Sequence, residues 1–282
     1  MTFSLHVPSR HAPGRSVPLG EPFEMLRDRH GVLIRSLTGW LIPAALVLVW
    51  QVACAAGWVP ETALPRPTAV LKTAWAMTAS GELPAAMGIS FLRATAGFVV
   101  GGGIGFALGL ANGMSRVSGR LSDTTLQMLR NVPHLALIPL VILWFGIGEG
   151  AKLFLVALGV FFPVYLNTLH GIRMVDPQLI EMGRSYGMSG PTLFRRVIFP
   201  GALPSIFVGV RFGLGIMWLT LIVAETIAAQ SGLGYMAMQG REFMQTDIVV
   251  MAIVIYALLG KVADMAATGA ERVFMPWRTA PQ

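Results

Sequence analysis

Long apolar runs alternate with short polar segments along the whole chain, and the runs have the length of a membrane rather than that of a soluble core. A hydrocarbon layer about 30 Å thick needs roughly 20 predominantly apolar residues of helix. Six stretches approach or reach that length, so the pattern predicts an all-α polytopic membrane protein with six transmembrane helices. The expected spans lie within residues 37–56, 90–111, 132–147, 153–169, 201–229 and 248–262.

Composition supports the same class. The 282 residues are 54% hydrophobic and 12% charged, with a mean hydropathy of +0.65. Soluble domains carry about 25% charged residues, so this chain has about half the charge that a water-facing surface needs. A disulfide scaffold is excluded, because Cys54 is the single cysteine. We expect no removable signal peptide, since no short apolar core with a cleavage site lies in the first 30 residues.

Basic residues are concentrated in alternate loops, although the net charge of +7 could by itself suggest nucleic-acid binding. With a cytoplasmic N-terminus, the opposite side holds only Arg66, Lys72, Lys152 and Arg241. The cytoplasmic side then holds Arg10, Arg15, Arg27, Arg29, Arg35, Arg116, Arg120, Arg173, Arg184, Arg195, Arg196, Arg272 and Arg278. Cytoplasmic loops attract Lys and Arg, so both termini are predicted to be cytoplasmic.

This topology divides the chain into three parts. A cytoplasmic tail is expected over 1–35, a six-span domain over 36–277 and a short tail over 278–282. Five glycines recur every four residues along the second span: Gly97, Gly101, Gly105, Gly109 and Gly113. Glycines at that spacing share one helix face and let another backbone approach closely. The face therefore serves either fixed packing within the chain or a sliding contact during function.

The most informative polar segment is the cytoplasmic loop at 173–200. Asp176 before Pro177 predicts a helix start, because Asp caps free N–H groups and proline suits the first helical position. Leu179, Met182 and Tyr186 then recur at spacings of three and four, which gives one apolar face. An exposed amphipathic helix either lies on the membrane surface or docks into a partner protein.

Glycine and proline positions predict how this loop is divided. Gly187 is expected to end the first helix in a left-handed conformation. A second helix start is expected at 189–191. Pro200 and Gly201 predict a break before the fifth span.

The loop resembles the EAA motif of ABC-importer permeases. Glu181 is followed six residues later by Gly187, and Val197 and Phe199 precede Pro200 as the apolar pair of that motif. Where two alanines are usual, this chain has Met and Gly at 182–183. Further segments resemble the nitrate/sulfonate/taurine group, above all its aliphatic-sulfonate branch: FPVYLNTLHGIR at 162–173, EMGRSYGMSG at 181–190, residues 199–235 and REFMQTD at 241–247.

The resemblance implies a type I ABC-importer permease in the bacterial inner membrane, working by alternating access. The implied partners are a second permease copy, two ABC ATPase subunits and a periplasmic substrate-binding protein. The implied cargo is an aliphatic sulfonate, with taurine or nitrate as alternatives. We expect no enzymatic activity and no cofactor in this chain: residues 146–152 lack the Gly and Ser or Thr of a Walker A motif, so ATP would bind the partner.

Two groups of site residues follow from the loop and the spans. The resemblance implies that ATPase coupling depends on Glu181, Arg184, Gly187, Arg195 and Pro200. Candidates for the substrate path are Arg211, His134 and Asn167, because polar groups inside spans are costly and often functional. A guanidinium can bind a sulfonate through two parallel hydrogen bonds.

The remaining charges inside spans have structural interpretations. Arg211 could instead pair with an acid on another helix, and Glu225 is too far along the same helix for direct contact. Arg93 and Arg130 lie near span ends and are expected to extend to the interface. Lys261 and Asp264 are expected to pair with each other.

Two other function classes remain open. An ATP-independent channel or secondary transporter would use the 173–200 loop as a membrane-surface helix. A membrane-embedded enzyme would need clustered His, Cys or carboxylates, and five scattered histidines with one cysteine supply no such cluster. The sequence contains no metal-binding signature and no nucleic-acid module.

Overall fold

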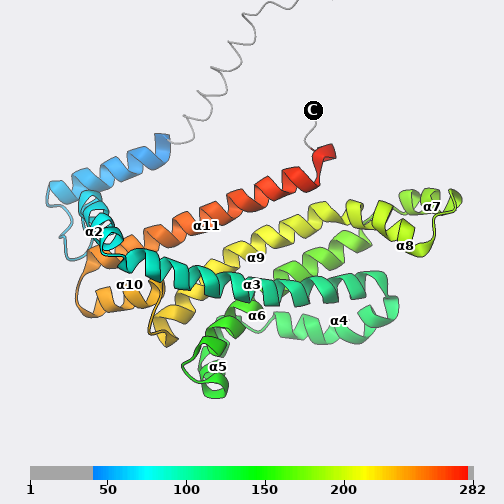
Figure 1. Cartoon of the computed structure of the whole chain (residues 1–282), viewed down its shortest axis with the longest axis horizontal. Helices are drawn as coiled ribbons and strands as arrows, with labels where there is room; N and C mark the ends of the chain where they lie inside the picture. The colour runs from blue at the N-terminus through cyan, green and yellow to red at the C-terminus, as the bar shows by residue number, and fades with distance from the viewer. Residues whose placement is uncertain (1–40, 279–282) are drawn as a thin grey trace, which may run out of the picture. The chain divides into compact units, whose positions relative to one another are not determined.

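The computed structural model describes residues 41–278, and every regular element in that range is helical. The chain divides into two compact units, Met1–Val52 and Ala53–Gln282. A helix covers Leu41–Ala55. The following elements are α2 (Pro67–Ala79), α3 (Glu82–Met114), α4 (Arg116–Arg130), η1 (His134–Leu137), α5 (Ile138–Phe145), α6 (Glu149–Arg173), α7 (Pro177–Ser185), α8 (Gly190–Leu193), η2 (Phe194–Ile198), α9 (Phe199–Ala228), α10 (Leu233–Glu242), α11 (Thr246–Phe274) and η3 (Pro276–Arg278) (Figure 1). The expected tail at 1–35 lies outside the described residues, as do 279–282 of the C-terminal tail.

Within the described residues, four helices are long and apolar enough to cross a membrane. They are α3, α6, α11 and the continuous helix Gly190–Ala228, whose longest part is α9. A bent pair, Thr124–Arg130 with His134–Phe145, gives a fifth if it counts as one span. The first expected span contains only the shorter apolar helix Leu41–Ala55. The structure therefore supports four or five of the six expected spans.

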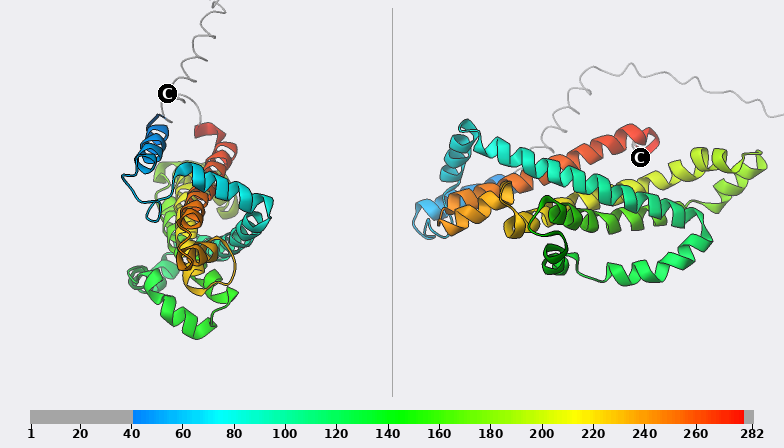
Figure 2. Two further views of the ribbon diagram at one scale, coloured as in Figure 1. Left: turned by 90° about the vertical axis from the view of Figure 1, so that its left-hand side faces the viewer. Right: turned by 60° about the horizontal axis from the view of Figure 1, so that its bottom comes forward.

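The glycine face of α3 packs directly against α6, and Figure 2 shows these long helices from two further sides. A Cβ atom at Gly105 would lie 2.6 Å from the carbonyl oxygen of Phe161. One at Gly109 would lie 2.7 Å from the carbonyl oxygen of Tyr165. Both distances are shorter than van der Waals contact, so only glycine permits this approach. Packing of the glycine repeat within the chain is confirmed.

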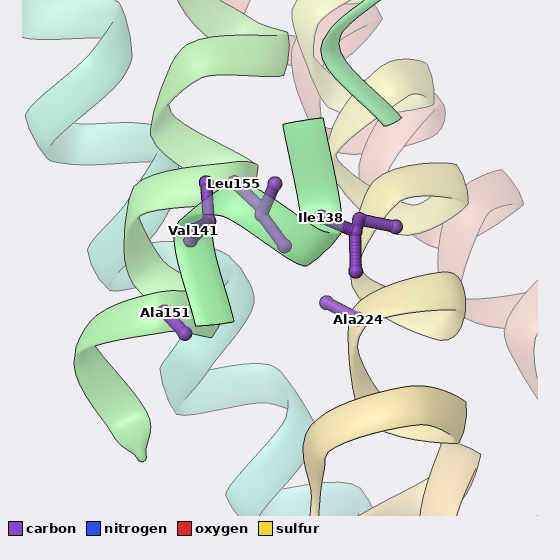
Figure 3. Packing of buried hydrophobic residues seen from close by; sticks show 5 residues of the cluster. All are labelled: Ile138, Val141, Ala151, Leu155 and Ala224. Carbon is purple, nitrogen blue, oxygen red and sulfur yellow. The ribbon is translucent and has the colours of Figure 1, made fainter. Parts of the chain in front are cut away.

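The helix of the third expected span is broken by 82° between Arg130 and His134. Pro133 lies in the break, where it cannot donate a helical hydrogen bond and restricts the residue before it. The bend lets Ile138 and Val141 of α5 pack with Ala151 and Leu155 of α6 and Ala224 of α9 (Figure 3). α5 and α6 are joined by a short connection, since α5 ends at Phe145 and α6 starts at Glu149.

The expected break at Pro200 is wrong. The helix runs through this proline, and a five-residue π-helical turn, η2, directly precedes α9. The N–H of Phe199 bonds to the carbonyl of Phe194, which is the wider i→i+5 pattern. This wider turn lies where a proline ring would otherwise clash with the preceding turn. The segment after Gly190 is therefore mechanically continuous with the fifth span.

Candidate functional site

The 173–200 loop contains the short helix α7, whose two ends are fixed by the residues that the sequence indicated. The Asp176 carboxylate accepts a hydrogen bond from the Gln178 N–H at 2.8 Å. At the other end, Met188 N–H donates to the Gly183 carbonyl at 3.1 Å, and Gly187 N–H donates to the Arg184 carbonyl at 2.9 Å. This pair of bonds is a Schellman cap, and Gly187 adopts the left-handed φ of +73° that it requires.

One face of α7 is anchored to the protein, and the other is exposed within residues 41–278. Ile180 packs on the cluster around Ile172 and Ala202. A Cβ at Gly183 would lie 2.6 Å from a methyl carbon of Leu193, so the helix rests closely on α8. The exposed apolar side chains of the helix and its cap are Leu179 (45%), Met182 (51%) and Tyr186 (79%). The predicted apolar face is therefore exposed in the part of the chain that the structure describes.

The structure brings three of the five proposed coupling residues together. Glu181, Arg184 and Gly187 lie on α7 and its cap, and all three are exposed. Arg195 is exposed on the π-helical turn. Pro200 is half-buried at the start of α9. The first three thus lie on the same short helix and its cap, whereas Pro200 belongs to α9.

The three substrate-path candidates have separate partners. Arg211 on α9 donates to Asp264 on α11 at 2.9 Å, and both side chains are partly exposed. The alternative of an acid on another helix is confirmed for Arg211, and Asp264 also lies 3.8 Å from Lys261, as expected. His134 Nε2 lies 3.1 Å from the Thr220 hydroxyl. Asn167 donates to the Pro163 carbonyl of its own helix at 2.8 Å.

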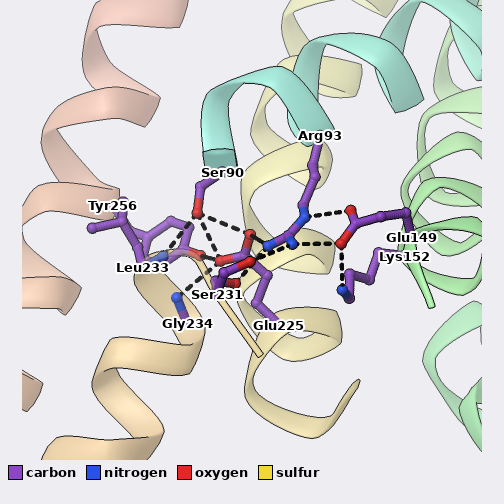
Figure 4. Close-up of polar contacts among 9 residues, drawn as sticks. All are labelled: Ser90, Arg93, Glu149, Lys152, Glu225, Ser231, Leu233, Gly234 and Tyr256. Carbon is purple, nitrogen blue, oxygen red and sulfur yellow. Dashed lines mark hydrogen bonds and ion pairs between the residues drawn. The ribbon is translucent and has the colours of Figure 1, made fainter. Parts of the chain in front are cut away.

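A buried charge cluster at the opposite end of α6 was missed by the sequence analysis. Its centre is Glu225 on α9, which is fully buried. The Glu225 carboxylate accepts hydrogen bonds from the Ser90 hydroxyl at 2.7 Å, Arg93 Nη1 at 2.8 Å, Gly234 N–H at 2.9 Å and the Tyr256 hydroxyl at 2.8 Å (Figure 4). These donors come from α3, α10 and α11. A buried carboxylate is tolerated only when it is paired and hydrogen-bonded in this way.

Arg93 is the cation of this cluster, and the expectation that it extends to the interface is wrong. Its side chain is only 6% exposed. Nη1 also donates to the Ser231 carbonyl at 2.6 Å, while Nε and Nη2 each donate to Glu149 at 2.6 Å. Lys152 donates to the same Glu149 carboxylate at 2.8 Å. Two basic and two acidic residues therefore balance one another in charge. This pairing offsets the desolvation cost of burying the Arg93 guanidinium.

Glycine permits the loop before α10 to close over the Glu225 carboxylate. Gly232 has a φ of +104°, and a Cβ there would lie 2.5 Å from Glu225 Oε1. Any side chain at this position would displace the carboxylate from its partners. The sequence signal was available as four charged residues at or within apolar helices: Arg93, Glu149, Lys152 and Glu225. Their pairing could not be predicted from the sequence, where Glu225 was a candidate partner for Arg211 alone.

Comparison with known proteins identifies the family. Residues 101–272 match the family described as "Binding-protein-dependent transport system inner membrane component". The chain belongs to this family. The matched range includes the glycine face of α3 from Gly101, the whole of α7, and Glu225. These transport-system membrane components are permease subunits, not enzymes. With its spanning helices, the chain is thus a multi-pass membrane protein of an ABC transport family.

Relatives within the family are similar over most of their length. The chain is 61% identical over 241 residues to the "Putative aliphatic sulfonates transport permease protein SsuC" of Escherichia coli, covering 86% of this chain and 92% of that protein. It is 44% identical over 259 residues to the protein of the same name from Bacillus subtilis, covering 90% and 93%. The taurine transport system permease protein TauC of E. coli is 39% identical over 61% of this chain and 63% of that protein.

The fold has a solved counterpart. An amino acid ABC transporter structure aligns with 70% of this chain and 95% of its own with a TM-score of 0.55. The sequence identity is 18%, so this similarity supports the fold alone. It agrees with an all-helical ABC-importer permease architecture.

Proposed function

We propose that the chain is the permease subunit of an ATP-driven ABC importer that carries aliphatic sulfonates across the bacterial inner membrane. The identity of 61% with the E. coli aliphatic sulfonates permease, over 92% of its length, supports this cargo. The taurine and nitrate permeases are 39% and 26% identical, so these anions are weaker alternatives. Homology within this family also supports two ATPase subunits, a periplasmic binding protein and a second permease copy as partners.

In the proposed topology both termini and α7 are cytoplasmic. Excess Lys and Arg on that side supports this orientation. The helix Leu41–Ala55 would serve as the first span and the bent pair around Pro133 as the third, which completes six. ATP would bind the ATPase partner, so the chain itself would need no cofactor.

The observation that best supports ATP coupling is the attachment of α7 to a continuous spanning helix. The outward face of Leu179, Met182 and Tyr186 offers an apolar surface of the kind that docks into a protein groove. Its inner side rests on α8 through Gly183 and Leu193. Because Gly190–Ala228 is unbroken, a push on α7 would move the fifth span as one body. Glu181, Arg184 and Arg195 would then be polar contacts to the ATPase, beside this face.

The transport proposal is tested by uptake of radiolabelled ethanesulfonate into cells that express the chain with its ATPase and binding protein. We expect uptake that requires all three components and that stops when the Walker A lysine of the ATPase is replaced. Uptake that persists without ATP hydrolysis would assign the chain to the secondary transporters instead. Competition by taurine or nitrate more strongly than by ethanesulfonate would move the cargo to that anion.

Gly187→Val is expected to lower ATP-dependent uptake by about tenfold or more, the equivalent of at least about 1.4 kcal/mol. A β-branched residue is strained at φ +73°, so the Schellman cap of α7 would open and misdirect its apolar face. Membrane insertion should not change, because an added Cβ meets nothing within 4 Å. The measurements are ethanesulfonate uptake and the amount of protein in the membrane fraction.

Gly190→Val is the matched control for this variant. Gly190 lies in the same loop, has no positive φ, and also has nothing within 4 Å of an added Cβ. It should transport at close to the normal rate. Normal uptake by Gly187→Val would exclude α7 as the coupling element.

A further inference from the structure

The burial of the charged groups around Glu149 is the reverse of the usual arrangement. Long basic side chains normally keep their charged ends in water. Here Arg93 is 6% and Lys152 is 3% exposed, whereas the Glu149 side chain that joins them is 58% exposed. Two buried cations therefore share one solvent-exposed carboxylate. A solvent-side anion can reach this position more easily than any other in the cluster.

The two partners of Arg93 differ in how easily they can be replaced. Glu225 is fully buried, and separating a buried ion pair leaves an uncompensated charge. Glu149 holds the other edge of the guanidinium through Nε and Nη2, and it can rehydrate when it leaves. The Glu225 side of Arg93 is thus permanent and the Glu149 side is exchangeable.

A sulfonate group fits the position of the Glu149 carboxylate. It offers two oxygens to one guanidinium edge, which is the bidentate geometry that Arg forms with planar and tetrahedral oxyanions. Lys152 Nζ, 2.8 Å from the same carboxylate oxygen, adds a second cation. The N-terminus of α6 begins at Glu149 and has no side-chain cap, so its positive end also favours an anion there.

A partner of Arg93, Ser231, also lines a cavity. The Ser231 hydroxyl is 2.9 Å from Arg93 Nη2, and the cavity of about 510 Å³ lies between α2, α3, α10 and the start of α11. Small-molecule sites have volumes of about 300–1,000 Å³, so a short alkyl chain could be accommodated. This end of α6 is opposite to the end that leads to α7, and it therefore faces outward in the proposed topology.

We propose that Arg93 and Lys152 form an oxyanion site that receives the sulfonate group of the cargo at the outward end of the permease. Glu149 is the tethered counter-ion that the sulfonate displaces, and Ser231 connects the site to the adjoining cavity. The cargo in this assignment rests on the proposed function. The anion site itself rests on the contacts and burial of Arg93, Lys152 and Glu149.

The test measures binding of labelled ethanesulfonate to the full-length permease in complex with its ATPase. The complex is placed in nanodiscs of zwitterionic phosphatidylcholine, at constant ionic strength and without the binding protein. Glu149→Gln removes the competing charge, so we expect the dissociation constant to fall about tenfold. Lys152→Gln removes a cation, so we expect the dissociation constant to rise about tenfold.

Glu61→Gln is the matched control. Glu61 forms an exposed ion pair with Arg66, at 62% and 44% side-chain exposure, so the same substitution there removes no anion competitor of a buried cation. Its dissociation constant should equal that of the unmodified complex. A thermal scan gives a second measurement: ethanesulfonate should raise the melting temperature of Glu149→Gln more than that of the unmodified complex.

Three results would overturn the assignment. One is an equal dissociation constant for the unmodified, Glu149→Gln and Lys152→Gln complexes; a second is a loss of thermal stability in Glu149→Gln that ethanesulfonate does not restore. A third is binding only when phosphatidylglycerol is present, since the ligand would then be a lipid headgroup. The proposed function would fail on a different result: uptake of taurine or nitrate, and not of ethanesulfonate, by the complete unmodified importer. In that case the binding of methanesulfonate to the same variants would still test the anion site.

Discussion

Arg93→Met is expected to lower the free energy of unfolding by about 3–5 kcal/mol, because it leaves the buried Glu225 carboxylate without its cation. Whole domains are stable by only about 5–15 kcal/mol, so little folded protein should accumulate. The donors from α3, α10 and α11 would then surround a buried carboxylate whose charge is no longer balanced. Thermal unfolding followed by size-exclusion chromatography of detergent extracts measures the loss.

Two further variants separate the ion pair from general damage. Arg66→Met breaks an exposed pair with Glu61 and should cost less than about 1 kcal/mol. The double variant Arg93→Met with Glu225→Met removes both buried charges, so it should be more stable than Arg93→Met alone. Equal small losses at Arg93 and Arg66 would show that the buried pair contributes nothing special.

Features set by neighbouring residues could be predicted from the sequence. The start of α7 at Asp176 and its end at Gly187 depend on hydrogen bonds that reach only a few residues along the chain. Aspartate strongly favours the position before a helix, and glycine favours the left-handed position just after one. The glycine repeat of α3 was also predicted as a packing face, since a period of four fixes one side of a helix whatever its partner.

Features set by distant residues could not be predicted in this way. Arg93 and Glu225 are 132 positions apart, and Arg211 and Asp264 are 53 apart. Their pairing depends on which helices pack together, and hydrophobic periodicity does not contain that information. Pro200 shows the converse failure: a strong local preference for a break was overridden by a π-helical turn within a long continuous helix.

Gly101→Leu is expected to have a comparable effect on stability, because it separates the two most extensively packed helices. A Cβ at Gly101 would overlap the carbonyl oxygen of Ala157 and lie 2.6 Å from its Cα, so backbone rather than a flexible side chain is in the way. Overpacking costs about 1–3 kcal/mol where side chains can adjust, and we expect about 3 kcal/mol or more here. Loss of the monodisperse peak in size-exclusion chromatography measures the effect.

Gly103→Leu tests whether that loss comes from the helix contact or from leucine in α3 as such. Gly103 is exposed and has nothing within 4 Å of an added Cβ, although it is only two residues away on the same helix. Leucine there should leave the elution profile and the melting temperature nearly unchanged. If both leucine variants unfold alike, the glycine face does not determine the spacing of α3 and α6. If only Gly101→Leu unfolds, the loss comes from the contact between α3 and α6, the two helices that also carry the Arg93–Glu149 pair.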